Sequence, residues 1–232
     1  MPDPLTDLAR LEGVPSGLAS ARAAVAAVLT DRGLRAMSAE DVATSLLTGA
    51  RASARLTDDP ERWAAGAVRL STELPGLAAV LRVAPGQALA RAHTLAAFDQ
   101  VPTGELGRLR TSPEVAARIS GLSELLTSRT EAPALVLAAV AHAEVASLAP
   151  FGSADGLVAR AVERMVLISS GFDPRGVIAS EVGHLRRRDD YQRLLGAYAS
   201  GSASGVREWI LHVAQAAVDG AEACPIVART RS

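Results

Sequence analysis

The stretch LAPFGSADGLVARA, residues 148–161, places small residues, an acid and an arginine where a helix is expected to begin. Gly152, Ala154 and Gly156 have little or no side chain, so a ligand can approach the backbone closely there. The first amides of a helix lack intrahelical partners and lie at the positive end of its dipole, which suits a phosphate. Arg160 follows one turn later, and its forked guanidinium could reach the same phosphate. The pattern predicts an anion site, although a tightly packed helix corner, with Arg160 in solvent or paired to a carboxylate, explains the same residues.

The elements that must position this stretch are helical almost throughout the chain. Apolar residues recur at helical spacing, and no run alternates with the period of a strand. The expected helices cover residues 17–32, 38–56, 57–70, 74–82, 85–98, 114–129, 132–148, from the elbow at 149–156 to about 170, 177–188, 189–200 and 203–222. Segment 132–150 is the most apolar, but it contains His142 and Glu144, so we expect a buried core helix rather than a membrane span. The sequence therefore predicts an all-α fold.

The composition excludes several function classes. The 232 residues carry a formal net charge of −1, so no bulk attraction to nucleic acid or to an anionic membrane is expected. The chain has no lysine, which excludes a Schiff-base lysine and a P-loop lysine. Cys224 is the only cysteine and cannot form an internal disulfide. The first residues lack the features of a signal peptide, so the expected location is the cytoplasm.

The histidines are not spaced as metal ligands, so no metal site is predicted. This holds for His93, His184 and His212. His142 lies two helical turns before Ala149, about 10 Å away along a helix axis, and is expected to be a core or hydrogen-bonded residue.

Residues 142–161, HAEVASLAPFGSADGLVARA, resemble the core motif of the Fic (Fido) family. The Pro-Phe pair at 150–151 and the second glycine, Gly156, stand at the family's positions, and the spacing to the next helix is preserved. Earlier in the chain, ELGRLR at 105–110 is similar to the Gly-x-x-Arg that precedes the family's core.

The C-terminal helices also resemble the family, with Tyr191 and Trp209 in the places of its tyrosine and tryptophan. The resemblance implies an N-terminal helical segment at 1–44, a Fic-like helical domain at 45–222 and a C-terminal tail at 223–232. It implies a helical bundle with a central buried helix, a glycine-rich elbow and a following helix. The β-hairpin flap of the family is expected to be short or absent, because a helix follows Arg110 almost at once.

Family members typically transfer AMP from ATP to a protein hydroxyl, with the motif histidine as general base and an acidic residue holding Mg²⁺. Here Ala149 takes the place of the histidine, Ser153 that of the acid and Leu157 that of the first arginine. Loss of a general base alone typically costs about 10²–10⁴-fold in rate. The resemblance therefore implies a protein adenylyltransferase ancestry without the groups that perform the transfer.

The remaining motif positions are candidates for phosphate or nucleotide binding. Asp155 replaces the family's asparagine and puts a negative charge where phosphate would lie, whereas Arg160 matches the family's second arginine. These residues leave open whether the chain binds ATP with Mg²⁺. The candidates are Gly152, Ser153, Ala154, Asp155, Gly156 and Arg160.

Residues 49–59, GARASARLTDD, resemble the inhibitory helix of many family members. Ser53 stands at its start, but Thr57 takes the place of its glutamate and Asp58 that of the following glycine. In the family that glutamate pairs with the second motif arginine. Here Asp58 or Asp59 could still pair with Arg160.

These observations favour a degenerate Fic-fold protein that has lost AMP transfer and acts by binding. Two alternatives stay open: a transferase of altered chemistry that uses a nucleotide or phosphorylated ligand at 149–160, and a helical structural or dimerisation module. The expected partner is another protein or a second copy of the chain. Nucleic acid is not expected, because Asp189 and Asp190 interrupt the basic run at 184–193 and predict a self-paired helix junction.

Overall fold

Helices α9 (Ala134–Leu148) and α10 (Asp155–Ser169) form a hairpin at the centre of the molecule. We analysed it in a computed structural model that describes residues 3–30, 37–225 and 227. The described residues form helices and no strand, so the all-α prediction is confirmed. Helix α9 is mostly apolar and mostly buried, as is typical of a helix packed among other helices. Within the described part of the chain, no helix combines the length and the apolar character needed to cross a membrane.

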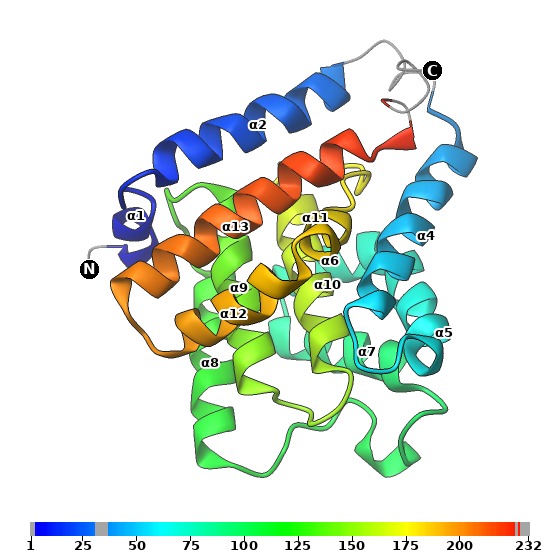
Figure 1. The fold of residues 1–232 in the computed structure, drawn as a ribbon. Coiled ribbons are helices and arrows are strands. Elements are labelled where there is room, and N and C mark those ends of the chain that lie inside the picture. Colours follow the sequence, from blue (N-terminus) through cyan, green and yellow to red (C-terminus); the bar gives the residue numbers. More distant parts are fainter. Residues whose placement is uncertain (1–2, 31–36, 226, 228–232) are drawn as a thin grey trace.

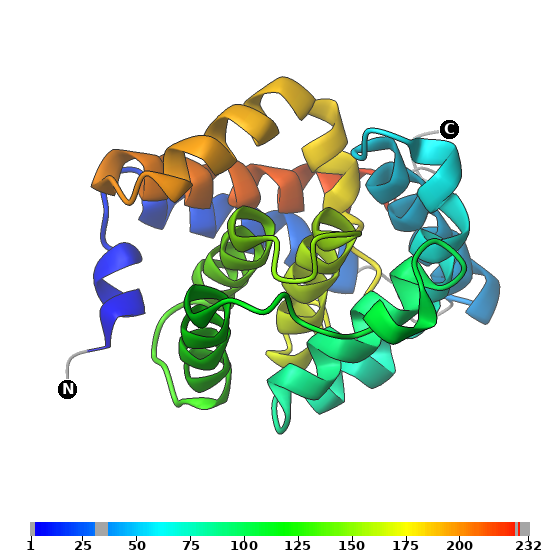
Figure 2. The same cartoon turned by 90° about the horizontal axis from the view of Figure 1, so that it is seen from below.

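The other helices cover the two sides of this hairpin. They are α1 (Pro4–Leu8), α2 (Val14–Thr30), α4 (Ala39–Arg55), α5 (Pro60–Thr72), α6 (Leu74–Leu81), α7 (Pro85–Ala97), α8 (Pro113–Thr127), α11 (Ser180–Arg186), α12 (Arg188–Ala199) and α13 (Ala203–Glu222). Helices α12 and α13 lie on one side, with α2 packed along α13, and α6 and α7 lie on the other, with α5 beyond α7 (Figures 1 and 2). Helix α8 packs against α9, and α11 contacts both α4 and α13.

Local sequence signals set the starts of α4 and α5. The Ser38 hydroxyl accepts from the amide of Asp41, and the Asp41 carboxylate accepts from the amide of Ser38, which makes a capping box at α4. Asp59 accepts from the amide of Arg62 and precedes Pro60 at the first position of α5.

The domain boundary predicted between residues 44 and 45 falls inside α4. Helix α1, which the sequence did not predict, and α2 place Leu5 and Leu18 in the main hydrophobic core. The N-terminal helical segment therefore shares the core of the Fic-like helical domain. Cys224 is buried in a smaller apolar cluster, and most of the predicted tail lies outside the described residues.

Close backbone contact joins α11 to α13. A Cβ atom added at Gly183 would lie 2.4 Å from the Cα of Ala216, so only glycine permits this approach. The contact brings the next residue, His184, to His212 on α13, with 3.0 Å between Nδ1 and Nε2.

Candidate functional site

The elbow between α9 and α10 reverses the chain within six residues, 149–154. Three of them have positive φ: Ala149 at 46°, Gly152 at 78° and Ala154 at 53°. Alanine is disfavoured in the left-handed region, so the surrounding contacts must hold these two residues there. The elbow has the sharp shape that the sequence predicted, and its polar groups decide whether it can hold a phosphate.

Asp155 directs its carboxylate back into the turn. Its Oδ1 accepts from the amide of Phe151 at 2.9 Å, and the amide of Gly152 also lowers its pKa. Burial outweighs these bonds and the charge of Arg110, and raises the pKa of Asp155 to about 6. A negative charge from the chain itself therefore stands at the start of α10.

Ser153, at the position of the family's acid, is bonded to α7. The amide of Gly107 donates to His93 Nδ1 at 2.9 Å, so the proton of the neutral ring is on Nε2, which donates to Ser153 Oγ at 3.0 Å. Burial lowers the pKa of His93, which favours this neutral form. The ring also stacks on Phe151 with 4.3 Å between centroids. Both nitrogens of the imidazole nearest the elbow are therefore used.

Arg110 holds the C-terminal end of α9. Its Nε and NH2 donate to the carbonyls of Ala149 and Leu148, each at 2.7 Å, and its amide donates to the carbonyl of Pro150 at 2.8 Å. A Cβ atom added at Gly152 would lie 3.2 Å from Arg110 Cδ, so this side chain lies over the turn. The Gly-x-x-Arg stretch thus supports the elbow.

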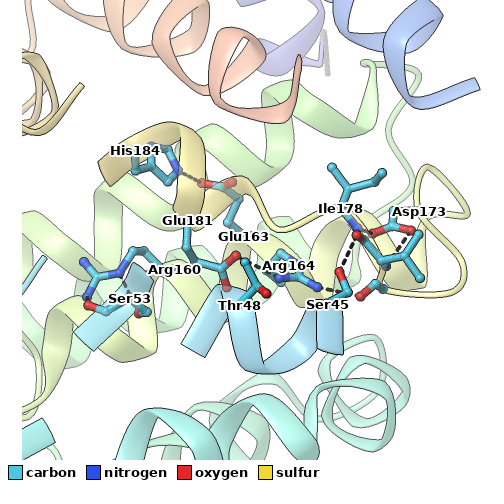
Figure 3. Close-up of polar contacts among 12 residues, drawn as sticks. Ser45, Thr48, Ser53, Arg160, Glu163, Arg164, Asp173, Ile178, Glu181 and His184 are labelled. Carbon is cyan, nitrogen blue, oxygen red and sulfur yellow. Dashed lines mark hydrogen bonds and ion pairs between the residues drawn. The ribbon is translucent and has the colours of Figure 1, made fainter. Parts of the chain in front are cut away.

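Arg160 points away from the elbow's surface into the core, and only 3% of its area is exposed. Its Nε donates to Ser53 Oγ at 2.8 Å, its NH2 to the Ser53 carbonyl at 2.9 Å and its NH1 to Tyr191 Oη at 3.1 Å. Figure 3 shows the two Ser53 contacts between α10 and the end of α4. Because every branch of the guanidinium has a partner, Arg160 is not free for a phosphate.

The structure brings only part of the predicted inhibitory-helix segment to Arg160. Ser53 contacts it, but Thr57 hydrogen-bonds the carbonyl of Ala54 in the turn after α4. Over the described ranges no ion pair joins Asp58 or Asp59 to Arg160, so that pairing is wrong. Asp59 instead caps α5.

The remaining motif positions lie as follows. Gly156 faces the Arg160 guanidinium, and an added Cβ would lie 3.3 Å from its NH1. Leu157, at the position of the family's first arginine, is 1% exposed and belongs to the main core. The Leu157 side chain is therefore packed in the core and is not presented to a ligand.

A comparison with solved structures identifies the fold. The chain is similar to a crystal structure of a Fic family protein from Desulfovibrio desulfuricans G20, with a TM-score of 0.65 and 17% sequence identity. The similarity covers 88% of this chain and 73% of that chain. This chain has the Fic fold. No protein-family model matches it, and no curated protein matches it by sequence.

Deeper in the Fic fold, a polar cluster joins α9, α10 and α11. Glu163 Oε2 accepts from His142 Nδ1 at 2.5 Å and from His184 Nε2 at 2.9 Å, and all three side chains are fully buried. His142 Nε2 lies 2.9 Å from Tyr191 Oη, and His184 Nδ1 contacts His212. His142 is a hydrogen-bonded core residue, as its sequence context predicts, whereas the cluster was not predicted.

The charges in this cluster follow from burial and contact. Burial lowers the pKa of His142 to about 4 despite Glu163, and burial followed by the neighbouring His184 lowers the pKa of His212 to about 3. Burial alone would raise the pKa of Glu163, but the two histidines bonded to it hold that pKa well below its usual range. Glu163 is therefore ionised, and Tyr191 accepts from Arg160 and donates to a neutral His142.

A second buried contact fixes α11 beside α10. Arg164 pairs with Glu181 at 2.8 Å and donates to the carbonyl of Gly176 at 2.7 Å. Asp173 accepts from the amides of Val177 and Ile178 at 3.1 and 2.8 Å. These contacts, drawn in part in Figure 3, give hydrogen-bond partners to backbone groups of the loop that leads to α11 and so position His184.

Proposed function

We propose that this Fic-fold protein has lost nucleotidyl transfer to protein hydroxyls and acts by binding. The observation that carries the proposal is the absence of a proton acceptor at position 149, where the resemblance places the catalytic histidine. Ala149 offers a methyl group where the resemblance places the general base, and both nitrogens of His93 are bonded to Ser153 and Gly107. Transfer to a hydroxyl needs a base within hydrogen-bond reach of that hydroxyl.

The residues of the elbow also do not fit Mg²⁺ and ATP. Ser153 has no carboxylate for the ion and already accepts a hydrogen bond from His93. Asp155 carries its charge in the turn where phosphate would lie, and Arg160 is bonded to Ser53 and Tyr191. We therefore derive no catalytic step through a nucleotide.

A transfer assay tests this proposal. Purified protein is incubated with ATP labelled on the α-phosphate and Mg²⁺, alone and with a cell extract as a source of targets, and labelled protein is measured. The triple variant Ala149→His, Ser153→Asp, Asp155→Asn restores the matching family residues and serves as the control for sensitivity. We expect no label with the wild-type chain, and AMP on the chain or on a target would overturn the proposal.

A second function has one observation in its favour, which is the raised pKa of Asp155. A carboxyl with a pKa of about 6 can exchange a proton near neutral pH, as a general acid or base must. We propose a transferase of altered chemistry, acting on a phosphorylated ligand at 149–160, as the alternative. It predicts that ATP or ADP binds the elbow and that Asp155→Ala abolishes turnover of the bound ligand without unfolding the chain.

Binding as the main function requires a surface other than the closed elbow. A cleft of about 990 Å³ lies between α2, the α8–α9 loop and the end of α10. Apolar residues such as Leu18 and Leu29 line it together with three arginines, Arg22, Arg82 and Arg129. We propose another protein, or a second copy of the chain, as the partner. Light scattering over a range of concentrations separates these two, because only self-association raises the mass of the purified chain.

A further inference from the structure

The buried cluster between α9, α10 and α11 holds three groups of the kind that bind transition metals. One ligand atom from each of His142, Glu163 and His184 lies within 4.8 Å of the other two. Imidazole nitrogen and carboxylate oxygen are common ligands of zinc in proteins. The three side chains come from three different helices, so a shared ion would join the central hairpin to α11.

The buried carboxylate of Glu163 is hydrogen-bonded through only one of its two oxygens within the described residues. Its second oxygen, Oε1, is buried and has no hydrogen-bond partner among the residues that the structure describes. Over the same residues, the ion pairs of Glu163 are with His142 and His184, and no arginine pairs with it. A buried carboxylate is costly unless its charge and its lone pairs are compensated.

The outer contacts of both histidines are those of metal ligands. A histidine that binds a metal through one nitrogen usually hydrogen-bonds a neighbour through the other, which fixes its orientation. His142 meets Tyr191 at 2.9 Å through Nε2, and His184 meets His212 at 3.0 Å through Nδ1. The nitrogens that face Glu163 are therefore the two that remain for an ion.

We propose that His142, Glu163 and His184 bind one divalent transition-metal ion, with Zn²⁺ as the expected ion and the Glu163 carboxylate as a bidentate ligand that also uses Oε1. A zinc ion about 2.0–2.2 Å from each donor separates tetrahedral donors by about 3.3 Å. The present nitrogen-oxygen distances are 2.5 and 2.9 Å, so binding opens each contact by less than about 1 Å. When the ion binds, each neutral ring changes tautomer: its proton moves from the nitrogen that faces Glu163 to the other nitrogen, which bonds Tyr191 in His142 and His212 in His184.

The site is structural rather than catalytic. The three side chains are fully buried, and the ring of Trp209 lies edge-on to His142 with 5.0 Å between centroids. No open coordination position faces solvent, and the ion must enter as the chain folds. The proposal does not depend on the proposed function, because it concerns residues other than those of the elbow.

Metal analysis after refolding tests the proposal. The wild-type chain is unfolded in guanidinium with a chelator, refolded with Zn²⁺ or Co²⁺, freed of excess metal by gel filtration and analysed by atomic emission. We expect about one ion per chain, and for Co²⁺ the visible absorption bands of a four-coordinate site. Glu163→Gln and His184→Gln should each lower the content at least tenfold. His93→Gln, a buried histidine outside the cluster, should leave it unchanged.

The wild-type result is decisive even if a variant does not fold. Less than about 0.1 ion per folded wild-type chain overturns the proposal, because structural zinc sites bind far more tightly than the metal concentrations used. Equal metal content in folded Glu163→Gln also overturns it. In a Trp63→Phe background, Co²⁺ but not Zn²⁺ should quench the fluorescence of Trp209, and bound Co²⁺ without quenching would place the ion elsewhere.

Discussion

Two polar regions lie along α10, the elbow at its first turn and the buried cluster two turns further on. In the elbow, the groups suited to an anion are bonded within the chain: Asp155 to Phe151, Ser153 to His93 and Arg160 to Ser53. In the cluster, Glu163 keeps a buried oxygen without a partner. The comparison shows that resemblance to a motif locates a site, whereas the hydrogen bonds decide whether its groups remain available to a ligand.

The largest expected effect is on stability and lies in the cluster. Glu163→Ala removes the acceptor of two buried imidazoles and leaves a cavity, so the free energy of unfolding should fall by about 3–5 kcal/mol. Ser153→Ala at the elbow removes one hydrogen bond and should cost about 1 kcal/mol. Denaturant unfolding of both variants measures the contrast. Equal losses would show that the two regions do not differ as described.

Arg160 links the two regions, and its loss should have the next largest effect. Arg160→Met keeps apolar volume but breaks the bonds to Ser53 and Tyr191, so we expect a loss of about 2–4 kcal/mol in the free energy of unfolding. Arg91→Met changes an exposed arginine on α7 and should stay within about 0.5 kcal/mol of wild type. If Arg160→Met is equally mild, Arg160 is free to serve a ligand.

The raised pKa of Asp155 predicts that this residue of the elbow makes the stability of the chain depend on pH. Its pKa is about 6 in the folded chain and near 3.9 when unfolded, so the folded form loses stability as pH rises between these values. The cost is absent below about pH 4 and reaches at most about 3 kcal/mol above pH 6. Asp155→Asn should therefore stabilise the chain at pH 8 and leave its stability at pH 4 unchanged.

Thermal unfolding of the wild-type chain and of Asp155→Asn across this pH range measures that difference. The asparagine oxygen can still accept from Phe151, so the comparison changes the charge and keeps the bond. A constant difference between the two proteins at every pH would show that the charge of Asp155 is not the cause.

The smallest effect concerns the backbone of the elbow. Ala154 has φ at 53°, and a glycine there relieves about 1–2 kcal/mol of backbone strain. The same glycine gives the unfolded chain more conformational entropy, which costs the folded state about 0.4–1 kcal/mol. Ala154→Gly should therefore stabilise the chain by up to about 1.6 kcal/mol. Ala116→Gly, in the regular helix α8, should destabilise it by about 1 kcal/mol. The same sign in both variants would contradict the assigned strain.

Local features of the fold could be predicted from the sequence. The helix starts at Ser38 and Asp59 depend on a few neighbouring residues, and the elbow motif lies within one stretch of chain, so both could be found by inspection. The position of α2 could not, because its packing on α13 joins residues nearly two hundred positions apart.

The buried cluster could not be predicted, because His142, Glu163 and His184 are each 21 residues apart and lie on three helices. No helical spacing relates them, and their contact depends on how α10 packs against α9 and α11. A signal was nevertheless present. Arg160, Glu163 and Arg164 stand on a helix that follows the central hairpin turn, and charged residues on a buried helix require partners.

Calorimetric titration of ATP with Mg²⁺ tests the central claim, that the elbow is closed to nucleotide, most directly. The wild-type chain and the variant Ala149→His, Ser153→Asp, Asp155→Asn are titrated side by side at pH 8, where Asp155 is ionised. The account predicts no binding heat from the wild-type chain at millimolar nucleotide. Micromolar binding to the wild-type chain, weakened by further negative charge in Gly156→Asp, would contradict it.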